Sequence, residues 1–441
     1  MKRFMYDSLL TWKASTDRKP LIIEGIRQCG KTWILKHFSE TEFKDVAYFN
    51  FEYDDRVQKI FENDLNVSRI IKDLGIMRNK SILPGTTILI LDEIQISPRA
   101  ITSLKYFCEN LPELHVAAAG SLLGVAIAQM GNKVSFPVGK VQMLKMYPLN
   151  FSEFLLAKDE ELLYEYLKDL SPEKAISAVF SSKLEEVYHE YLITGGLPEV
   201  VSSWIKHQDI GIVVTKQNEI IGTYEKDFIK YAPVSEFSKL TLIWNAIPAQ
   251  LAKDNQKFLF SHVKQGMRAR DLEDSLEWLI SAGLIYKVEK IDRPYIPITT
   301  YSDITNFKIY FSDVGLLRRM SKFPADVVFD TSSLTADMRG ILAENFVLTE
   351  LISNDYQRSF FWKSGGIAEV DYVIQEGIDV IPIEVKSSKR VRSRSLTEYR
   401  KKYSPRIAVR TSLRDMSRHS DEYGEVLEIP LWLIWKLKAY L

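Results

Sequence analysis

The sequence predicts a multidomain α/β protein: a doubly wound parallel sheet first, then a helical middle with a winged-helix-like segment, then a second α/β region. Three observations support this fold class. Strand-like apolar runs alternate with helical stretches near the N-terminus, helical patterns fill the middle, and strand signals return near the C-terminus. A chain of 441 residues is long enough for two or three domains. We expect them at residues 1–150, 151–330 and 331–441.

Composition and charge narrow the class of protein. The chain has 58 Lys and Arg against 58 Asp and Glu, so no global charge indicates a nucleic acid or a membrane surface as partner. Two cysteines, Cys29 and Cys108, are too few for a disulfide framework, which indicates a reducing cytoplasm. The longest apolar stretch, 116–128, is too short to span a bilayer. We expect a cytoplasmic protein without a membrane partner, and homo-oligomer formation stays open.

Apolar runs define the strands expected in the N-terminal sheet. They are residues 21–24, 46–52, 88–91 and 116–119. Helical patterns separate these runs, and this alternation is typical of a doubly wound parallel sheet. The segment 136–154 then passes through two prolines, which indicates that the chain leaves the sheet there. A new helix is expected to begin at this point with Ser152 as its N-cap.

The first predicted strand runs directly into the pattern G-x-x-x-x-G-K-T. The residues concerned, with the next one along, are Gly25, Arg27, Gln28, Cys29, Gly30, Lys31, Thr32 and Trp33. The glycines let backbone N–H groups turn around a polyphosphate, and the following helix adds the positive end of its dipole. Lys31 would reach the β- and γ-phosphates, and Thr32 would place its hydroxyl on Mg²⁺. The pattern predicts a P-loop NTPase sheet; a chance match in a glycine-containing turn is the alternative.

A second motif, formed by two acidic residues, supports the same site. The strand expected at 88–91 ends in Asp92 and Glu93, and a buried parallel strand delivers such residues to the sheet edge where ligands bind. Asp92 would hold the Mg²⁺ shell, and Glu93 would orient or deprotonate the attacking water. Carboxylates capping the next helix are the alternative. Ser121, after the next strand, is expected either to sense the γ-phosphate or to cap a helix.

The middle of the chain reads as helices, interrupted by a turn at 194–198. From about 240 to 290 the order is helix, turn, helix, strand, which suits a winged helix. The candidate reading helix carries basic side chains at Lys264, Arg268 and Arg270. It also carries several acids, which oppose close contact with phosphates. DNA reading and a packing or hinge role both remain open for this helix.

The C-terminal region carries a second set of chemically related residues. A helix expected at 341–352 contains Glu344, and the strands after it contain Asp371 and then Glu384-Val385-Lys386. Alternation along a strand places Glu384 and Lys386 on one face. Glu344, Asp371 and Glu384 would hold one or two Mg²⁺ ions, and Lys386 would stabilise charge or activate water on a phosphodiester. An edge strand with an alternating ion pair is the alternative.

Basic residues follow this acidic set closely. They are Lys389, Arg390, Arg392, Arg394, Arg400, Lys401, Lys402, Arg406, Arg410 and Arg414. We call them the basic flank. Such a run is usually a solvated helix face, but beside a metal-binding set it also suits a phosphate backbone. The sequence therefore indicates DNA as a partner of the basic flank.

Taken together, the motifs resemble those of bacterial and archaeal AAA-type ATPases with a C-terminal domain of unknown function that ends in a PD-(D/E)xK, restriction-endonuclease-like fold. The resembling segments are 25–32, 91–95, 119–121, 147–154, 195–198, 343–347, 369–372 and 383–386. The resemblance covers nearly the whole chain and implies binding and hydrolysis of ATP, with a nuclease-like C-terminal domain. Where that family has a Gly-Arg pair, a candidate arginine finger, this chain has Gly139-Lys140. Lysine is a point charge, which indicates weak or partner-stimulated hydrolysis.

Two functional hypotheses follow. In the first, an ATP-hydrolysing switch or motor passes its state to a nuclease-like, DNA-acting C-terminal domain. In the second, ATP only controls the conformation of a nucleic-acid-binding or protein-interaction module, and the C-terminal triad is a vestige. The first hypothesis assigns catalytic roles to Lys31 and Glu93 at one site, and to Asp371, Glu384 and Lys386 at the other.

Overall fold

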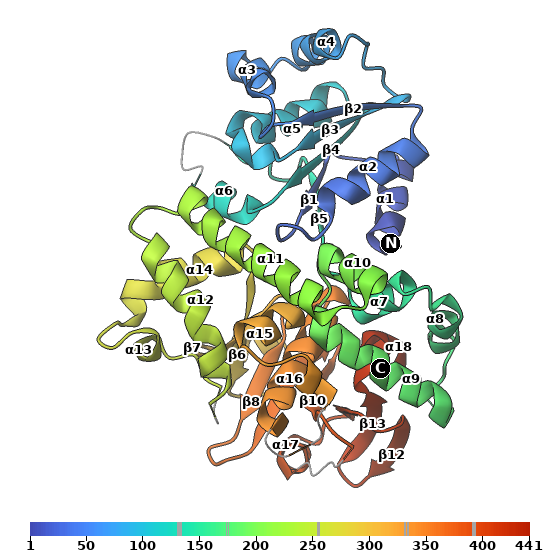
Figure 1. The fold of residues 1–441 in the computed structure, drawn as a ribbon, viewed down its shortest axis with the longest axis vertical. Coiled ribbons are helices and arrows are strands. Elements are labelled where there is room, and N and C mark those ends of the chain that lie inside the picture. Colours follow the sequence, from blue (N-terminus) through green and yellow to red (C-terminus); the bar gives the residue numbers. More distant parts are fainter. Residues whose placement is uncertain are drawn as a thin grey trace. The chain divides into compact units, whose positions relative to one another are not determined.

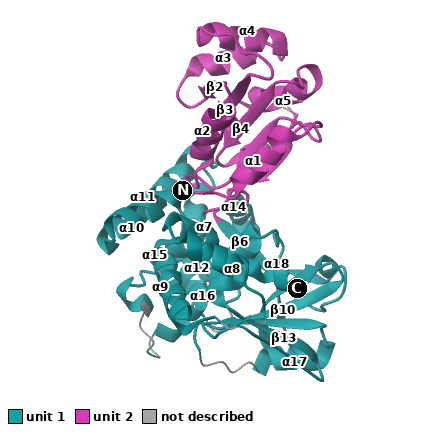
Figure 2. Ribbon diagram, turned by 90° about the vertical axis from the view of Figure 1, so that its right-hand side faces the viewer, with its two compact units in different colours: residues 1, 149–280, 285–441 teal, residues 2–148, 281–284 magenta. Residues whose placement is uncertain are grey.

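A computed structural model describes residues 1–129, 135–172, 174, 176–253, 256–329, 332, 335–389 and 394–441. The chain folds into two compact units (Figures 1 and 2). Unit 2 comprises residues 2–148 and the short segment 281–284, and unit 1 comprises residue 1, 149–280 and 285–441. We describe each unit by itself.

Unit 2 alternates strands and helices. In chain order its elements are α1 (Met5–Ala14), β1 (Leu21–Glu24), α2 (Lys31–Glu42), β2 (Asp45–Asn50), α3 (Asp55–Asn63), α4 (Val67–Met77), β3 (Thr87–Asp92), the 3₁₀ turn η1 (Ile94–Ile96), α5 (Pro98–Asn110), β4 (His115–Gly120), α6 (Leu123–Gln129) and β5 (Gln142–Lys145). Several helices begin at side-chain caps. Asp54 accepts from the backbone N–H of Arg56 at the start of α3, and Ser97 accepts from Ala100 at the start of α5.

Within the described residues, five parallel strands form the sheet of unit 2 in the order β2-β3-β4-β1-β5. This parallel sheet confirms the predicted N-terminal fold, and all four predicted strands are present. The prediction that the chain leaves the sheet after residue 136 is wrong, because β5 pairs with β1 from Leu21↔Gln142 to Glu24↔Lys145. This edge strand is mostly exposed and lacks a buried apolar run, so its sequence gives little strand signal.

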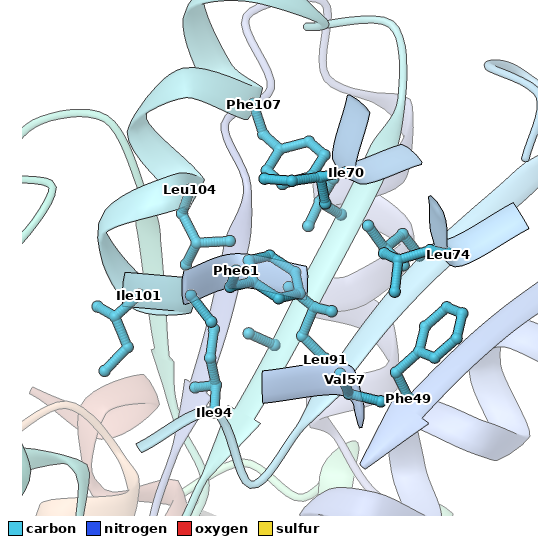
Figure 3. Packing of buried hydrophobic residues seen from close by; sticks show 14 of the residues in the cluster. Phe49, Val57, Phe61, Ile70, Leu74, Leu91, Ile94, Ile101, Leu104 and Phe107 are labelled. Atoms are coloured by element: carbon cyan, nitrogen blue, oxygen red, sulfur yellow. The ribbon is translucent and has the colours of Figure 1, made fainter. Parts of the chain in front are cut away.

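A single hydrophobic core fills the space between one face of this sheet and helices α3, α4 and α5 (Figure 3). Alternate residues of the strands face it, including Leu89 and Leu91 of β3. The other residues of β3 are buried too, since the burial pattern of Thr87–Asp92 is uniform. Burial on both faces explains why β3 reads as a continuous apolar run.

Unit 1 begins with helices and continues with strands and helices together. Its helices are α7 (Phe151–Ala157), α8 (Glu161–Lys168), α9 (Ala178–Thr194), α10 (Pro198–His207), α11 (Ile210–Tyr231), α12 (Phe237–Leu251), α13 (Phe260–Val263), α14 (Ala269–Ser281), α15 (Val314–Met320), α16 (Ala336–Ser353), α17 (Arg394–Tyr403) and α18 (Leu437–Tyr440). Its strands are β6 (Ile285–Ile291), β7 (Ser302–Phe311), β8 (Phe360–Lys363), β9 (Glu369–Glu376), β10 (Asp379–Val385), β11 (Ile407–Ser412), β12 (Ser417–Asp421) and β13 (Gly424–Pro430). Short 3₁₀ turns are η3 (Ile298–Tyr301), η4 (Asp326–Phe329) and η6 (Leu431–Lys436).

The strands of unit 1 form one mixed sheet. Within the described residues, its eight strands run in the order β12-β13-β11-β10-β9-β8-β6-β7. Strands β6 and β7 precede residue 330, and the other strands follow it. Both the α/β character of the C-terminal region and its predicted strands are therefore present in the structure. The three-part division at 150 and 330 stays a prediction, to which the structure adds that one sheet draws strands from both sides of residue 330.

The structure corrects one prediction for the helical region and leaves another open. The predicted helix after residue 150 forms, but its N-cap is Asn150, not Ser152. The Asn150 side chain accepts from the Glu153 backbone N–H, and the Glu153 side chain accepts in return, which is a capping box. The order α12, α13, α14, β6 matches the predicted sequence of elements at about 240–290, and winged-helix character stays a prediction. Among the described residues, no helix is long and apolar enough to cross a membrane.

Candidate functional site

The loop between β1 and α2 has the compact backbone that its glycines permit. A side chain at Gly25 would lie 2.2 Å from the backbone oxygen of Met146, so only glycine fits there. Gly30 precedes α2 in the left-handed region, with φ of 103°. The loop therefore delivers the chain to the first turn of α2 with its N–H groups available to a ligand, as a phosphate-binding loop requires.

Lys31 lies inside this loop. Its ammonium group donates to the backbone oxygens of Gly25 at 2.9 Å and Ile26 at 2.8 Å. The neighbouring Cys29 is buried, and its backbone oxygen accepts from the Arg3 guanidinium at 2.9 Å. Arg3 also donates to the backbone oxygen of Tyr147 at 2.6 Å. An arginine near the N-terminus thus ties the loop to the residues after β5, a role that the sequence did not indicate.

Thr32 and Asp92 meet across the site although they lie on different elements. The Thr32 hydroxyl donates to Oδ2 of Asp92 at 2.9 Å, and the Asp92 carboxylate is buried. The Tyr48 hydroxyl, from β2, donates to the same oxygen at 2.6 Å. Burial, followed by this hydrogen bond, raises the pKa of Tyr48 well above its ordinary value. The hydroxyl of Tyr48 therefore stays protonated and acts as a donor.

Glu93 lies at the end of β3, where side chains from the end of β4 and from η1 contact it. Its backbone is left-handed, with φ of 54°. Oε2 of Glu93 accepts from the Ser121 hydroxyl at 3.0 Å and from Nε2 of Gln95 at 2.5 Å. Ser121 therefore bonds the second carboxylate of the acidic motif, and its predicted part in γ-phosphate sensing stays a prediction. Thr32 contacts Asp92, and Ser121 contacts Glu93, beside the loop that holds Lys31. Their roles at a phosphate site stay predictions.

Other predicted contact residues lie at the rim of the loop. Arg27 pairs with Glu52 at 3.8 Å. Trp33 is 47% exposed and stacks on His37, with ring centroids 5.0 Å apart. Gln28 has a positive φ of 66°, which fits the tight turn between the two glycines. Lys140, at the position of the candidate arginine finger, pairs with Glu109 at 3.0 Å.

A magnesium ion fits this site by the chemistry of its donors. Among the described residues, no group of three or more His, Cys, Asp or Glu side chains is arranged to hold a metal ion. Mg²⁺ needs fewer protein ligands, because it commonly takes one or two oxygens from the protein and the rest from phosphates and waters. The Thr32 hydroxyl and the Asp92 carboxylate, 2.9 Å apart, form such an oxygen pair.

The C-terminal motif residues also come together, in unit 1. Oδ2 of Asp371, on β9, accepts from the backbone N–H of Val385 at 2.7 Å. Glu384 and Lys386, on and just after β10, form an ion pair at 2.7 Å, as alternation along the strand predicts. Glu384 is buried, and its Oε2 has no partner among the described residues. Burial, together with the nearby Asp371 carboxylate, raises the pKa of Glu384 to about 7.

Glu344 joins the same network through α16, but its oxygens are already engaged. Oε2 accepts from the Tyr310 hydroxyl at 2.9 Å, and Oε1 accepts from the Gln256 amide at 3.1 Å. Burial and the Asp371 carboxylate raise the pKa of Glu344 to about 7. The three predicted carboxylates therefore share one electrostatic network without forming a three-carboxylate metal site. The metal role of Glu344 stays a prediction, and Tyr310 and Gln256 each already donate to one of its oxygens.

A second lysine in this network was missed by the sequence. Lys308, on β7, is 1% exposed and lies 2.5 Å from Oε1 of Glu369. It also donates to the Gln256 side chain at 2.8 Å. Burial by itself would lower the pKa of Lys308. The nearby carboxylates of Glu344, Glu369 and Asp371 outweigh burial and raise this pKa above its ordinary value. We call Lys308, Glu344, Glu369, Asp371, Glu384 and Lys386 the acid–lysine cluster.

The basic flank is less available for a ligand than its sequence indicates. Several of its residues form ion pairs with acids from other segments: Lys389 with Glu185, Arg400 with Asp421, Arg406 with Asp379, and Arg410 with Glu428. Arg390 and Arg392 lie outside the described residues. The excess of positive charge along this run is therefore partly offset in space by acids from other segments.

Most of what the sequence missed comes from neighbouring strands. Tyr48 bonds Asp92 from 44 positions away, and Gln256 bonds Glu344 from 88 positions away. Lys308 in turn bonds Gln256, 52 positions before it. Nothing in their local sequence differs from an ordinary strand or loop residue. A signal was available only for Gln95, which follows Asp92 and Glu93 so closely that it must share their end of β3.

Comparisons with known families assign parts of the chain. Residues 17–155 match the model of a family described as AAA domain. Residues 185–327 and 339–432 match two families described as domains of unknown function, DUF8612 and DUF4143. Lys308 and Gln256 thus belong to one matched segment, while the carboxylates of the cluster belong to the next.

Relatives resemble the chain along most of its length. The uncharacterized protein MJ1544 of Methanocaldococcus jannaschii is 22% identical over 399 residues, which is 86% of this chain and 78% of the relative. The solved Walker-type ATPase PABY2304 of Pyrococcus abyssi matches 72% of this chain and 95% of its own, with 15% identity and a TM-score of 0.44. The Aeropyrum pernix ORC1 protein, solved in complex with DNA, matches 73% and 91%, with 13% identity and a TM-score of 0.26. The family match, together with the loop geometry, supports an AAA-type P-loop ATPase domain at residues 17–155.

Proposed function

We propose that unit 2 binds ATP with Mg²⁺ and hydrolyses it slowly, as the control input of unit 1. The observation that carries this proposal is the 2.9 Å contact of Thr32 with Asp92, beside Lys31 and Glu93. Loop N–H groups and Lys31 would bind the phosphates, and Thr32 and Asp92 would hold the metal. The metal, when bound, neutralises phosphate charge. Glu93 accepts a proton from the attacking water.

Replacing Lys31 with alanine tests the phosphate site. We expect ATP affinity to fall by about 10- to 100-fold, since a hydrogen bond to a charged group contributes about 1.5–3 kcal/mol. Titration with a fluorescent ATP analogue measures this affinity. Lys59→Ala, at an exposed position of α3, is the matched control and should bind as wild type does. Equal affinities of the wild type and Lys31→Ala would reject the site.

The environment of Lys140 supports slow hydrolysis. Its ammonium group is paired with Glu109 and is a point charge, not the planar fork of an arginine. We therefore propose that a partner stimulates turnover, and a second copy of the chain is one candidate. Homo-oligomer formation and a cytoplasmic location, which the two free cysteines favour, stay predictions.

A second function is proposed for the acid–lysine cluster: hydrolysis of a phosphodiester within a restriction-endonuclease-like fold. The buried Oε2 of Glu384, which has no partner among the described residues, supports it, because a buried carboxylate oxygen without a hydrogen bond favours a cation. Asp371 and Glu384 would hold one Mg²⁺, and Lys386 would stabilise developing charge. DNA contacts would come from the basic flank, where Arg394 is exposed at the start of α17.

A nuclease assay separates this second function from the alternative of a non-catalytic module. With Mg²⁺ or Mn²⁺, wild type should cleave DNA, whereas Asp371→Ala and Lys386→Ala should each lose about 10²-fold or more in rate. Cleavage that persists in both variants would place the activity elsewhere. DNA binding that depends on ATP, without any cleavage, would favour the module with a vestigial triad.

A further inference from the structure

We propose that Gln95 is a positioning residue for ATP hydrolysis, acting through Glu93. This inference rests on the proposed function of unit 2. It gives a role to a residue that belongs neither to the P-loop nor to the acidic pair Asp92 and Glu93. Gln95 lies in η1, directly after β3, and is only 8% exposed. Its side chain turns back toward the carboxylate that precedes it in the sequence.

The contacts of Gln95 converge on one oxygen of Glu93. Nε2 of Gln95 donates to Oε2 of Glu93 at 2.5 Å, and the Ser121 hydroxyl donates to the same Oε2 at 3.0 Å. Nε2 also lies 3.4 Å from the Ser121 oxygen, which closes a three-membered ring of hydrogen bonds. In the described part of the chain, Oε1 of Glu93 has no hydrogen-bond partner. One carboxylate oxygen is thus fixed, and the other is left to accept a proton from water.

The orientation of the Gln95 amide supports a role beyond packing. Its Oε1 is buried and has no partner among the described residues. The reverse orientation would place this oxygen against the Glu93 carboxylate and lose the donor. Room for Oε1 comes from Gly120 at the end of β4, where a Cβ would lie only 2.9 Å from it. The structure therefore leaves one polar atom unpaired so that the other can bind Glu93.

The backbone conformation of Glu93 brings its carboxylate to the same side of the chain as the Gln95 amide. Glu93 has left-handed dihedrals, with φ of 54° and ψ of 40°, immediately before η1. This conformation is unfavourable for a residue other than glycine and persists when surrounding contacts hold it. The ring formed by Glu93, Gln95 and Ser121 supplies such contacts.

Steady-state kinetics of Gln95→Met test the proposal, since methionine keeps the chain length and removes both hydrogen bonds. We expect kcat to fall about 10-fold or more, with KM and the affinity for a fluorescent ATP analogue unchanged. In a Glu93→Gln background, the same substitution should cause no further loss, because its effect passes through Glu93. Gln58→Met is the matched control. Among the described residues, the Gln58 amide donates to a backbone oxygen, that of Phe51, at 2.9 Å, so its loss should change the melting temperature and not kcat.

Each result decides a different point. An unchanged kcat in Gln95→Met, or an equal additional loss in the Glu93→Gln background, would overturn the role of Gln95 while leaving ATP hydrolysis in place. A parallel rise in KM would assign Gln95 to substrate binding, which also contradicts the proposal. If the wild type shows no ATP turnover, the proposed function itself fails, and the role of Gln95 falls with it.

Discussion

Replacing Glu93 with glutamine is expected to lower ATP turnover by about 10²- to 10⁴-fold, the usual contribution of a positioned general base. Glutamine retains an oxygen that can accept from Ser121 and Gln95, so the geometry at the end of β3 should survive. It cannot accept a proton from water. Nucleotide affinity should stay close to that of wild type, because the phosphate contacts come from the loop and Lys31.

Turnover is best measured by phosphate release, and affinity by titration with a fluorescent ATP analogue. Glu113→Gln, at an exposed position before β4, serves as control for the loss of one negative charge and should hydrolyse normally. A Glu93→Gln variant with wild-type turnover would move the catalytic base to another residue and leave Glu93 a structural role.

Lys308→Met is expected to destabilise unit 1 by about 3–5 kcal/mol, the cost of removing one partner from a buried ion pair. Lys308 is 1% exposed and lies 2.5 Å from Glu369, so its loss leaves a carboxylate without its buried counter-charge. Because a chain with two compact units need not unfold in one step, a local measurement is required. Hydrogen exchange of the β7, β8 and β9 amides supplies it.

The chain offers a matched control for this variant. Lys363 pairs with the other oxygen of the same Glu369, at 2.9 Å, but its side chain is 33% exposed. Lys363→Met should therefore cost only about 0–1 kcal/mol. Equal exchange rates in the two variants would mean that burial of Lys308 carries no special cost, and that the cluster is more open to water than its geometry indicates.

The geometry of the proposed phosphate site was predictable because its information is local. Residues 25–32 dictate their own backbone, and Asp92 follows from a strand whose burial on both faces is visible as an apolar run. Parallel strands then bring Thr32 and Asp92 to one edge of the sheet without further specification. Glu384 and Lys386 were predictable for a similar reason, since alternation along one strand fixes their common face.

The remainder depends on pairings between distant segments. Tyr48 reaches Asp92 because β2 lies beside β3, and Lys308 reaches Glu369 through a sheet whose strand order the sequence does not reveal. The basic flank shows that pairings between distant segments can also cancel a feature that the sequence suggests. Its residues read as an excess of positive charge along the chain, while Asp421, Asp379 and Glu428 offset that charge in space.

The mixed sheet of unit 1 has a consequence for how the protein can be divided or made. Strand β8 pairs on one side with β9 and on the other with β6, which was synthesised about seventy residues earlier. A fragment that starts at residue 331 would open the edge of β8 to pairing with other chains and would lack Lys308. On the ribosome, the edge of β6 that faces away from β7 must likewise wait for β8 before it is paired. The fragment that starts at residue 331 would therefore be prone to aggregate through the unpaired edge of β8.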